Sequence, residues 1–167
     1  MKISMALALM LAAGTATTAQ AQSYDAEREL DRFSRDALKA TLAELGATAT
    51  EREDMPNMAV EFDNGLKADA LLMACEDQAT SSNCLGTSIL ATFARPEGAT
   101  GAQIAGAINE YNYRQNFGRA YESPQGEISL RMYIIADGGI TMDNYRNQIG
   151  LFAVSAGKFV GYLNGGN

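Results

Sequence analysis

Two cysteines are the residues with the most specific chemistry in this sequence. Cys75 and Cys84 are separated by residues 76–83, and the chain contains no histidine. Zinc, iron and copper sites usually need histidine or several cysteines, so we predict neither a metal site nor a cofactor. Outside the cytoplasm, a single pair of cysteines favours a disulfide. We therefore predict a Cys75–Cys84 disulfide, with two buried free thiols as the alternative.

Carboxylates are the remaining candidates for catalysis, and we predict that they do not form an active site. Glu127 and Asp137 bracket one predicted strand, and Asp143 lies nearby in the sequence. Acid–base catalysis needs two carboxylates that converge in a cleft with different pKa values, and nothing in this spacing brings them together. Serine chemistry lacks both a Gly-x-Ser-x-Gly motif and a histidine that could activate the hydroxyl. We therefore predict a non-enzyme and keep a carboxylate-based hydrolase as an alternative.

The charge balance argues against nucleic acid as a partner. The 167 residues include 20 Asp and Glu against 13 Lys and Arg, which gives a net charge of −7. An acidic surface repels phosphate backbones and anionic lipid headgroups. The charges are scattered along the chain, which is typical of a surface that keeps a protein in solution.

The N-terminus has the features of a secretory signal peptide. Lys2 precedes an apolar run over residues 3–13, and residues 19–21, Ala-Gln-Ala, form a small-x-small cleavage site. A membrane-spanning helix needs about 20 apolar residues, so this run is too short to be one. We expect removal of residues 1–21, one mature domain over residues 22–167, no membrane span, and a periplasmic or secreted location.

Apolar spacing predicts three helices. The first covers residues 25–45, the second begins after Thr100, which has capping-box spacing to Gln103, and the third begins after Thr141. Apolar side chains recur at spacings of three and four along the third helix: Tyr145, Ile149, Phe152, Ala156, Phe159 and Leu163. We interpret this stripe as a core face that packs on a sheet. The alternative is a coiled-coil seam between the two subunits of a homodimer.

Strands are predicted between these helices. They cover residues 48–53, 58–62, 67–75, 84–93, 117–122 and 127–136. Asp63, Asn64 and Gly65 form a hairpin signal between the second and the third of these strands. A three-residue loop places Glu61 opposite Lys67 and keeps the apolar residues on one face. We therefore predict that loop, with Gly65 in the left-handed conformation.

Adjacent strands joined by hairpin turns predict an α+β fold, in which a mainly antiparallel sheet is packed by the N-terminal and C-terminal helices. The strands that contain Cys75 and Cys84 are neighbours in this arrangement, which brings the two Cα atoms to about 5 Å, within disulfide range. Cys75 shares a strand face with Leu71 and Met73, opposite the core face, so we expect the disulfide on the outer side of the sheet. Those two apolar side chains are also a candidate patch for a partner.

A block in the C-terminal half carries a resemblance to a known family. Residues 109–112, Asn-Glu-Tyr-Asn, and residues 116–121, Asn-Phe-Gly-Arg-Ala-Tyr, are similar to the Asn-x-Trp-Asn and Arg-Phe-x-Arg-Ala-Tyr segments of the YbjN family. Gly126 and the long last helix follow in the family's order. This bacterial family is described as sensory transduction regulators, and its fold resembles that of type III secretion chaperones. The resemblance implies a chaperone-like α+β fold and no known catalysis.

Asn112, Arg119 and Tyr121 are the residues that we single out for binding, because they are polar or amphipathic and lie at a helix-to-strand junction. The structural alternative is that Asn112 caps the helix, Arg119 pairs with a carboxylate and Tyr121 packs on the sheet. In the same block, Tyr111 stands where the family usually has tryptophan, and Asn116 where it often has arginine. We predict a non-catalytic protein that binds another polypeptide in a chaperone-like or regulatory role, with a small-molecule binder as a further alternative.

Overall fold

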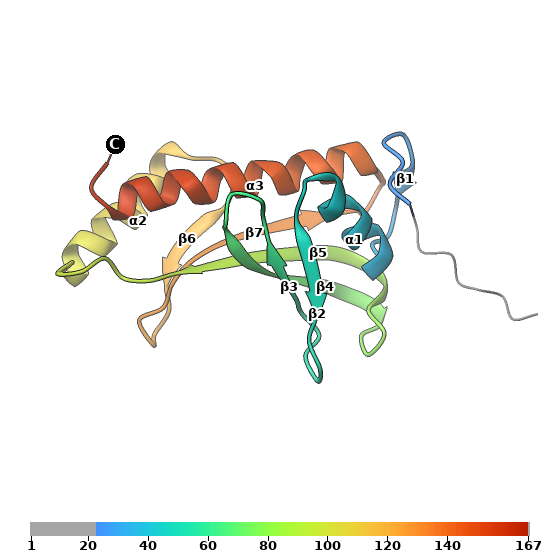
Figure 1. Ribbon diagram of the computed structural model, residues 1–167, viewed down its shortest axis with the longest axis horizontal. Coiled ribbons are helices and arrows are strands. Elements are labelled where there is room, and N and C mark those ends of the chain that lie inside the picture. The colour runs from blue at the N-terminus through green and yellow to red at the C-terminus, as the bar shows by residue number, and fades with distance from the viewer. Residues whose placement is uncertain (1–22, 167) are drawn as a thin grey trace, which may run out of the picture.

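The computed structural model describes residues 23–166, and its helices gather on one side of a six-stranded sheet (Figure 1). The predicted signal peptide, residues 1–21, lies outside the described residues. The sheet contains β2 (Thr48–Glu51), β3 (Met58–Glu61), β4 (Lys67–Asp77), β5 (Ser82–Phe93), β6 (Arg119–Glu122) and β7 (Ile128–Ile135). The helices are α1 (Arg35–Glu44), α2 (Gly101–Arg114) and α3 (Met142–Leu163). A separate two-stranded sheet joins β1 (Glu29–Leu30) to β8 (Ile140–Thr141).

The strand order β2-β3-β4-β5-β7-β6 is antiparallel throughout. Helix α2 carries the chain from the end of β5 to the sheet edge at β6, and a hairpin then returns β7 to the place beside β5. The predicted α+β fold with a mainly antiparallel sheet is therefore confirmed. None of the helices in the described part of the chain is long and apolar enough to cross a membrane.

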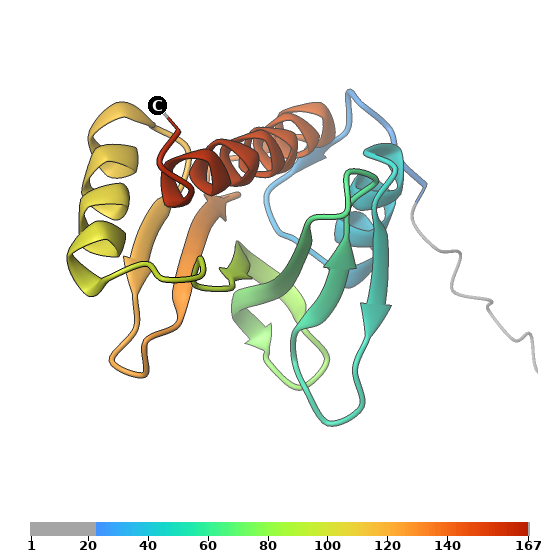
Figure 2. The same cartoon turned by 60° about the vertical axis from the view of Figure 1, so that its left-hand side comes forward.

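Helix α3 supplies the centre of the helical layer, and both views show it lying across the sheet (Figures 1 and 2). Its predicted stripe is buried at all six positions, and Phe152 and Phe159 have no exposed surface. The Tyr145 ring stacks on Phe33 with a centroid distance of 4.3 Å, and its hydroxyl lies 2.7 Å from the Thr87 hydroxyl of β5. The stripe is therefore a core face within one chain, and the coiled-coil alternative is wrong.

The first helix begins ten residues later than residues 25–45 predict. Ser34 caps its N-terminus, where the Ala37 amide donates to the Ser34 hydroxyl at 3.2 Å. Leu30 and Phe33 are buried, as a core stripe requires, but they are buried from an extended segment. Phe33 forms two backbone hydrogen bonds with Cys84, of 2.7 and 3.0 Å. A spacing of three residues between two apolar positions fits a helix turn. It also fits an extended segment whose backbone pairs with distant strands.

The hairpin between β3 and β4 has the predicted three-residue loop. Glu61 lies opposite Lys67, and the Phe62 amide donates to the carbonyl of Leu66 at 2.9 Å. Gly65 has a φ of +80°, which is the left-handed conformation that glycine adopts without strain. The opposite charges and the apolar face were thus sufficient to predict the register of this hairpin.

Candidate functional site

One face of the main sheet is covered by helices, and the other carries a different set of side chains. On β7, Leu130, Met132 and Ile134 are buried. At the alternate positions of the same strand, Tyr133 is 47% exposed and Ile135 is 54% exposed. Strand residues alternate between faces, so the second set points away from α1 and α3. The surface opposite the helices, which we call the open face, consists of Asp69, Leu71, Met73, Ser88, Leu90, Arg119, Tyr121, Arg131, Tyr133 and Ile135.

The sheet register brings residues from four strands into one row on the open face. Arg119 of β6 lies directly opposite Arg131 of β7, and Arg131 lies opposite Leu90 of β5. Leu90 in turn lies opposite Asp69 of β4. Cross-strand partners on one face have Cβ atoms about 5 Å apart, so these four side chains are close neighbours although they are far apart in the sequence.

Two tyrosines hold the arginines of this row in place. The Tyr121 ring has the guanidinium of Arg119 5.6 Å from its centroid and that of Arg131 at 5.7 Å. Arg131 also lies 5.9 Å from the Tyr133 ring and donates a 3.0 Å hydrogen bond to its hydroxyl. These distances are in the range of cation–π interactions. The hydrogen bond to Tyr133 raises the pKa of Arg131 above its ordinary value, so this guanidinium stays charged.

The two arginines have no acidic partner among residues 23–166. Neither Arg119 nor Arg131 lies within 4 Å of a carboxylate oxygen in this part of the chain. Asp69, the acid in the same row, is bound instead by Arg52 at 2.8 Å and by Asn57 at 2.9 Å. The Nε atom of Arg131 is buried and has no hydrogen-bond partner. Two adjacent unpaired cations are unusual in a chain with 20 acidic and 13 basic residues.

Apolar side chains continue the open face beyond the arginines. A hollow of about 170 Å³ is lined by Pro56, Asn57, Asp69, Leu71, Ser88, Leu90 and Arg131. Next to it, Met73 and Ile135 converge over Gly86, where a Cβ added to the glycine would lie 3.5 Å from Met73 Cε and 3.3 Å from Ile135 Cδ1. The absence of a side chain at Gly86 therefore lets these two residues form a small apolar surface. The proposed patch at Leu71 and Met73 thus belongs to the open face.

Asn112 does not lie on the open face. Its side-chain amide donates to the carbonyl of Ala120 and accepts from the Ala120 amide, both at 3.0 Å. Ala120 belongs to β6, the edge strand, and these are backbone groups that a further strand would use. Asn112 therefore attaches α2 to the sheet and closes this edge. The interpretation that it caps the end of α2 is wrong.

The structure thus brings two of the three predicted binding residues together and adds two that the sequence did not reveal. Arg119 and Tyr121 lie on the open face, and the expected pairing of Arg119 with a carboxylate is wrong for the described residues. Arg131 and Tyr133 were missed as site residues. The alternation of β7 placed Arg131 on the outer side of its strand, but only the pairing of β6 with β7 shows that it lies opposite Arg119.

The two departures from the family pattern lie away from this face. Tyr111 is fully buried, donates to the Phe117 carbonyl at 3.0 Å and packs against Phe159 with a centroid distance of 5.0 Å. Its burial raises the pKa of its hydroxyl above the ordinary tyrosine value. The aromatic residue at this position therefore contributes to the core, while Asn116 is exposed in the loop before β6.

The carboxylates considered for catalysis do not converge. Glu127 and Asp137 lie at opposite ends of β7, whose eight residues span roughly 25 Å. Asp143 is bound at the start of α3 by Arg146 and Asn147, and the hydrogen bonds from Arg146 hold the pKa of this carboxyl below its usual value. Within residues 23–166 no group of three or more His, Cys, Asp and Glu is placed to hold a metal ion.

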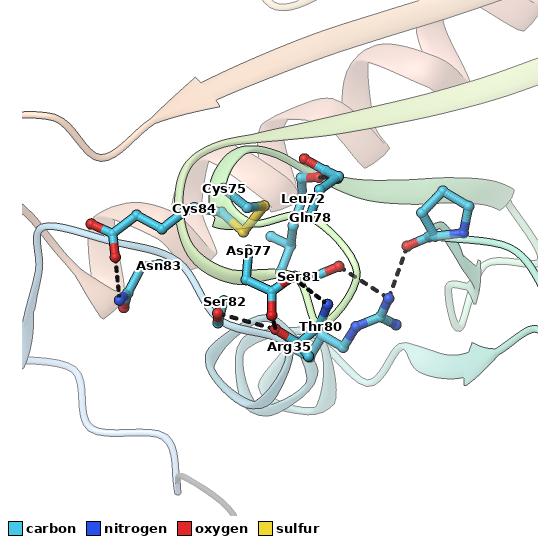
Figure 3. Close-up of a disulfide and its surroundings, with 12 residues drawn as sticks. Arg35, Leu72, Cys75, Asp77, Gln78, Thr80, Ser81, Ser82, Asn83 and Cys84 are labelled. Carbon is cyan, nitrogen blue, oxygen red and sulfur yellow. Dashed lines mark hydrogen bonds between the residues drawn. A yellow bond between two sulfur atoms is a disulfide. The ribbon is translucent and has the colours of Figure 1, made fainter.

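The structure joins Cys75 and Cys84 by a disulfide where β4 and β5 meet their hairpin loop (Figure 3). Cys84 is fully buried, and Cys75 packs against the same core cluster, so the expected position on the outer side of the sheet is wrong. The reason is local: Ala74 has a φ of +51° and is exposed, which interrupts the alternation that placed Cys75 beside Met73. The segment around Phe33 then covers Cys84.

A larger hollow lies elsewhere, between α2 and the C-terminal end of α3. Its volume is about 530 Å³, and Glu97, Glu110 and Tyr162 are among its lining residues. Glu110 is already bound by Arg114 one helix turn away. Its other polar side chains already have partners, because Gln103 caps α2 and Asn164 donates to the Val160 carbonyl, and much of the remaining wall is glycine and alanine.

The protein is therefore an α+β domain that has helices on one face of an antiparallel sheet and leaves the opposite face exposed. A model of the YbjN family, described as “Putative bacterial sensory transduction regulator”, matches residues 34–164. The chain belongs to the YbjN family.

Two solved structures resemble the chain at low sequence identity, and the first of them shows the same fold. The crystal structure of YbjN from E. coli matches with a TM-score of 0.57 and 13% identity, over 77% of this chain and 88% of that chain. The HopA1–SchA chaperone–effector complex matches with a TM-score of 0.47 and 9% identity, over 72% of this chain and 88% of that chain. No curated protein sequence matches the chain.

Proposed function

We propose that this member of the YbjN family is a non-catalytic, exported protein that binds another polypeptide on the open face, in a regulatory or chaperone-like role. The observation that carries the proposal is the pair of unpaired arginines, Arg119 and Arg131, beside exposed apolar and aromatic side chains. Arginine, tyrosine and apolar residues are the types that concentrate at the centres of protein interfaces.

The shape of the open face favours an extended partner over a small molecule. Its side chains come from four neighbouring strands, and its hollow measures only about 170 Å³. Pockets for small ligands usually enclose about 300–1,000 Å³ and surround most of the ligand. A polypeptide segment can instead contact several rows of a sheet face at once and place alternate side chains on it.

Export is the second part of the proposal. It is supported by the signal-peptide pattern in residues 1–21 and by the disulfide, because disulfides persist in the periplasm and outside the cell. The absence of histidine from the sequence and the separation of Glu127 from Asp137 support a role in binding without catalysis.

Site-specific photo-crosslinking in the intact cell envelope tests this proposal. A crosslinking amino acid replaces Ile135, which is 54% exposed on the open face, and the matched control carries it at Val154, which is 61% exposed on α3. We expect capture from position 135, but not from position 154, of a polypeptide that mass spectrometry identifies and that binds the purified protein in calorimetry. Equal capture at both positions, or none at position 135, contradicts the proposal.

A further inference from the structure

We propose that Arg119 and Arg131 form a carboxylate-binding site, so that the polypeptide bound on the open face presents an Asp or Glu side chain to them. This inference rests on the proposed function and names the chemistry of the partner. Both guanidinium groups contact the same ring, that of Tyr121, at 5.6 and 5.7 Å from its centroid.

The cross-strand pairing of two like charges is the first argument. Arg119 and Arg131 are direct partners in the β6–β7 ladder, and like charges at such positions destabilise a sheet. An acidic side chain between them would remove the repulsion, yet no carboxylate of residues 23–166 takes that place. A carboxylate from a partner would be bound by two positive charges, and arginine matches its two oxygens with paired N–H groups.

The surroundings of Arg131 are the second argument. Its hydrogen bond to Tyr133 and its contacts with two rings hold the guanidinium in one orientation before any ligand arrives. Its Nε is a buried donor without a partner, which is unfavourable and leaves the group with unused hydrogen-bonding capacity. Arg131 also lines the hollow, so a group that enters there reaches the arginine.

The row across the sheet gives the ligand a direction. Leu90 follows Arg131 in the row, and Asp69 follows Leu90. An apolar side chain next to the acidic one would contact Leu90 and Leu71 in the hollow. A second carboxylate at the far end of the row would lie beside the acidic Asp69, and the cation at that place, Arg52, is already paired with Asp69. The site therefore fits an acidic residue with an apolar neighbour, bound with the carboxylate toward β6.

Binding of defined peptides tests this assignment. The probe is a labelled extended peptide in which Glu and Leu are two residues apart with Ser between them, so that both side chains face the sheet, and its counterpart has Gln in place of Glu. We expect the full chain to bind the Glu peptide at least about ten-fold more tightly than the Gln peptide at low salt, because charge-assisted hydrogen bonds are lost with Gln. R119Q and R131Q should each lower the affinity for the Glu peptide by about ten-fold and leave the affinity for the Gln peptide unchanged.

A charge-matched control and a folding control accompany these variants. R32Q removes the same charge outside the open face and should leave the affinity within about two-fold. R131K keeps the charge but not the planar donor set, so it should bind the Glu peptide more weakly than the wild type if the orientation of the guanidinium matters. Circular dichroism spectra that match the wild type establish that each variant is folded.

The outcomes separate this inference from the proposed function. If position 135 captures an identified polypeptide while the Glu and Gln peptides bind alike, the carboxylate site is overturned and the binding role stands. If the Glu peptide binds in an arginine-dependent way but position 135 captures nothing, the proposed function fails instead. Inorganic phosphate that displaces the Glu peptide more strongly than acetate at the same concentration would reassign the site to phosphate and overturn the carboxylate assignment.

Discussion

The two faces of β7 show how one strand serves both folding and surface chemistry. Leu130, Met132 and Ile134 are buried under the helices, whereas on the other face the half-buried Arg131 donates a hydrogen bond to the exposed Tyr133. The covered face is a continuous apolar core, and its residues are interchangeable within limits of volume. The open face contains specific polar groups whose geometry depends on cross-strand pairing. Core residues and surface polar groups are thus alternate residues of the same strand.

The largest expected effect lies on the covered face. Phe152 has no exposed surface and packs at the centre of α3 against the sheet, so Phe152→Ala should destabilise the protein by about 3–5 kcal/mol. Urea unfolding monitored by circular dichroism measures this. Val154→Ala on the exposed side of the same helix is the control and should cost about 0.5 kcal/mol or less. Equal effects at both positions would contradict the assignment of the core face.

The second effect concerns the disulfide that joins the ends of β4 and β5. Replacement of Cys75 and Cys84 by Ser should cost about 2–3 kcal/mol, since the bond closes a short loop and restrains the unfolded chain. Unfolding of the wild type in the presence of a reductant should show the same loss, and the double variant should not respond to the reductant. Mass spectrometry of the unreduced protein provides the direct test: two alkylated thiols would mean that the bond is absent.

The edge of β6 lies between the two faces and should respond less. Asn112→Ala removes both hydrogen bonds to Ala120, so we expect a loss of about 1–2 kcal/mol. Asn109→Ala removes the same side chain from an exposed position of α2 and is the matched control. Hydrogen exchange at the Ala120 amide should accelerate only in the Asn112 variant. If the amide of Ala120 stays protected, Asn112 is not what closes the edge.

Alkaline pH should lower the stability of the protein, because Tyr145 is buried in the covered face. Burial raises the pKa of Tyr145 above the ordinary value, so the folded state keeps this proton while the unfolded state releases it near pH 10. Stability from this group is therefore complete below pH 10 and falls above it, by at most about 1.4 kcal/mol for each pH unit. Urea unfolding at a series of pH values measures the slope.

Two phenylalanine variants separate this effect from general alkaline unfolding. Tyr145→Phe should flatten the decline above pH 10, although it loses the hydrogen bond to Thr87 and is less stable at neutral pH. Tyr113→Phe, at a tyrosine that is 86% exposed, should leave the slope unchanged. Identical slopes for both variants would show that Tyr145 does not carry the pH dependence.

The same contrast explains which parts of the molecule could be predicted from the sequence. The stripe of α3, its Thr141 cap and the β3–β4 hairpin follow from periodicity, capping and charge pairing, which are local signals. The start of α1 was predicted ten residues early, because Leu30 and Phe33 are buried through backbone pairing with distant strands. The turn of the disulfide toward the core depends on the left-handed Ala74, for which alanine gives no signal.

The candidate site was predictable only in part for the same physical reason. Arg119 and Tyr121 could be selected from the matching block, and the outward position of Arg131 follows from strand alternation. These residues lie side by side only because β7 returns between β5 and β6. No short sequence motif predicts this long-range strand pairing. Asn112 was selected with them, but its polar side chain serves the edge of the sheet.

The smallest expected effect on stability lies on the open face, and its size and salt dependence distinguish a binding surface from a structural one. Arg119→Gln removes one of two like charges that face each other across β6 and β7, and it also removes a cation–π contact with Tyr121. Each contribution is below about 1 kcal/mol and they oppose each other, so the free energy of unfolding should change by less than about 0.5 kcal/mol.

Added salt screens the repulsion between Arg119 and Arg131 in the wild type. The wild type should therefore gain more stability than the variant between about 50 and 300 mM salt. A large loss of stability, or an equal response to salt, would mean that Arg119 supports the fold and is not held against repulsion for a ligand.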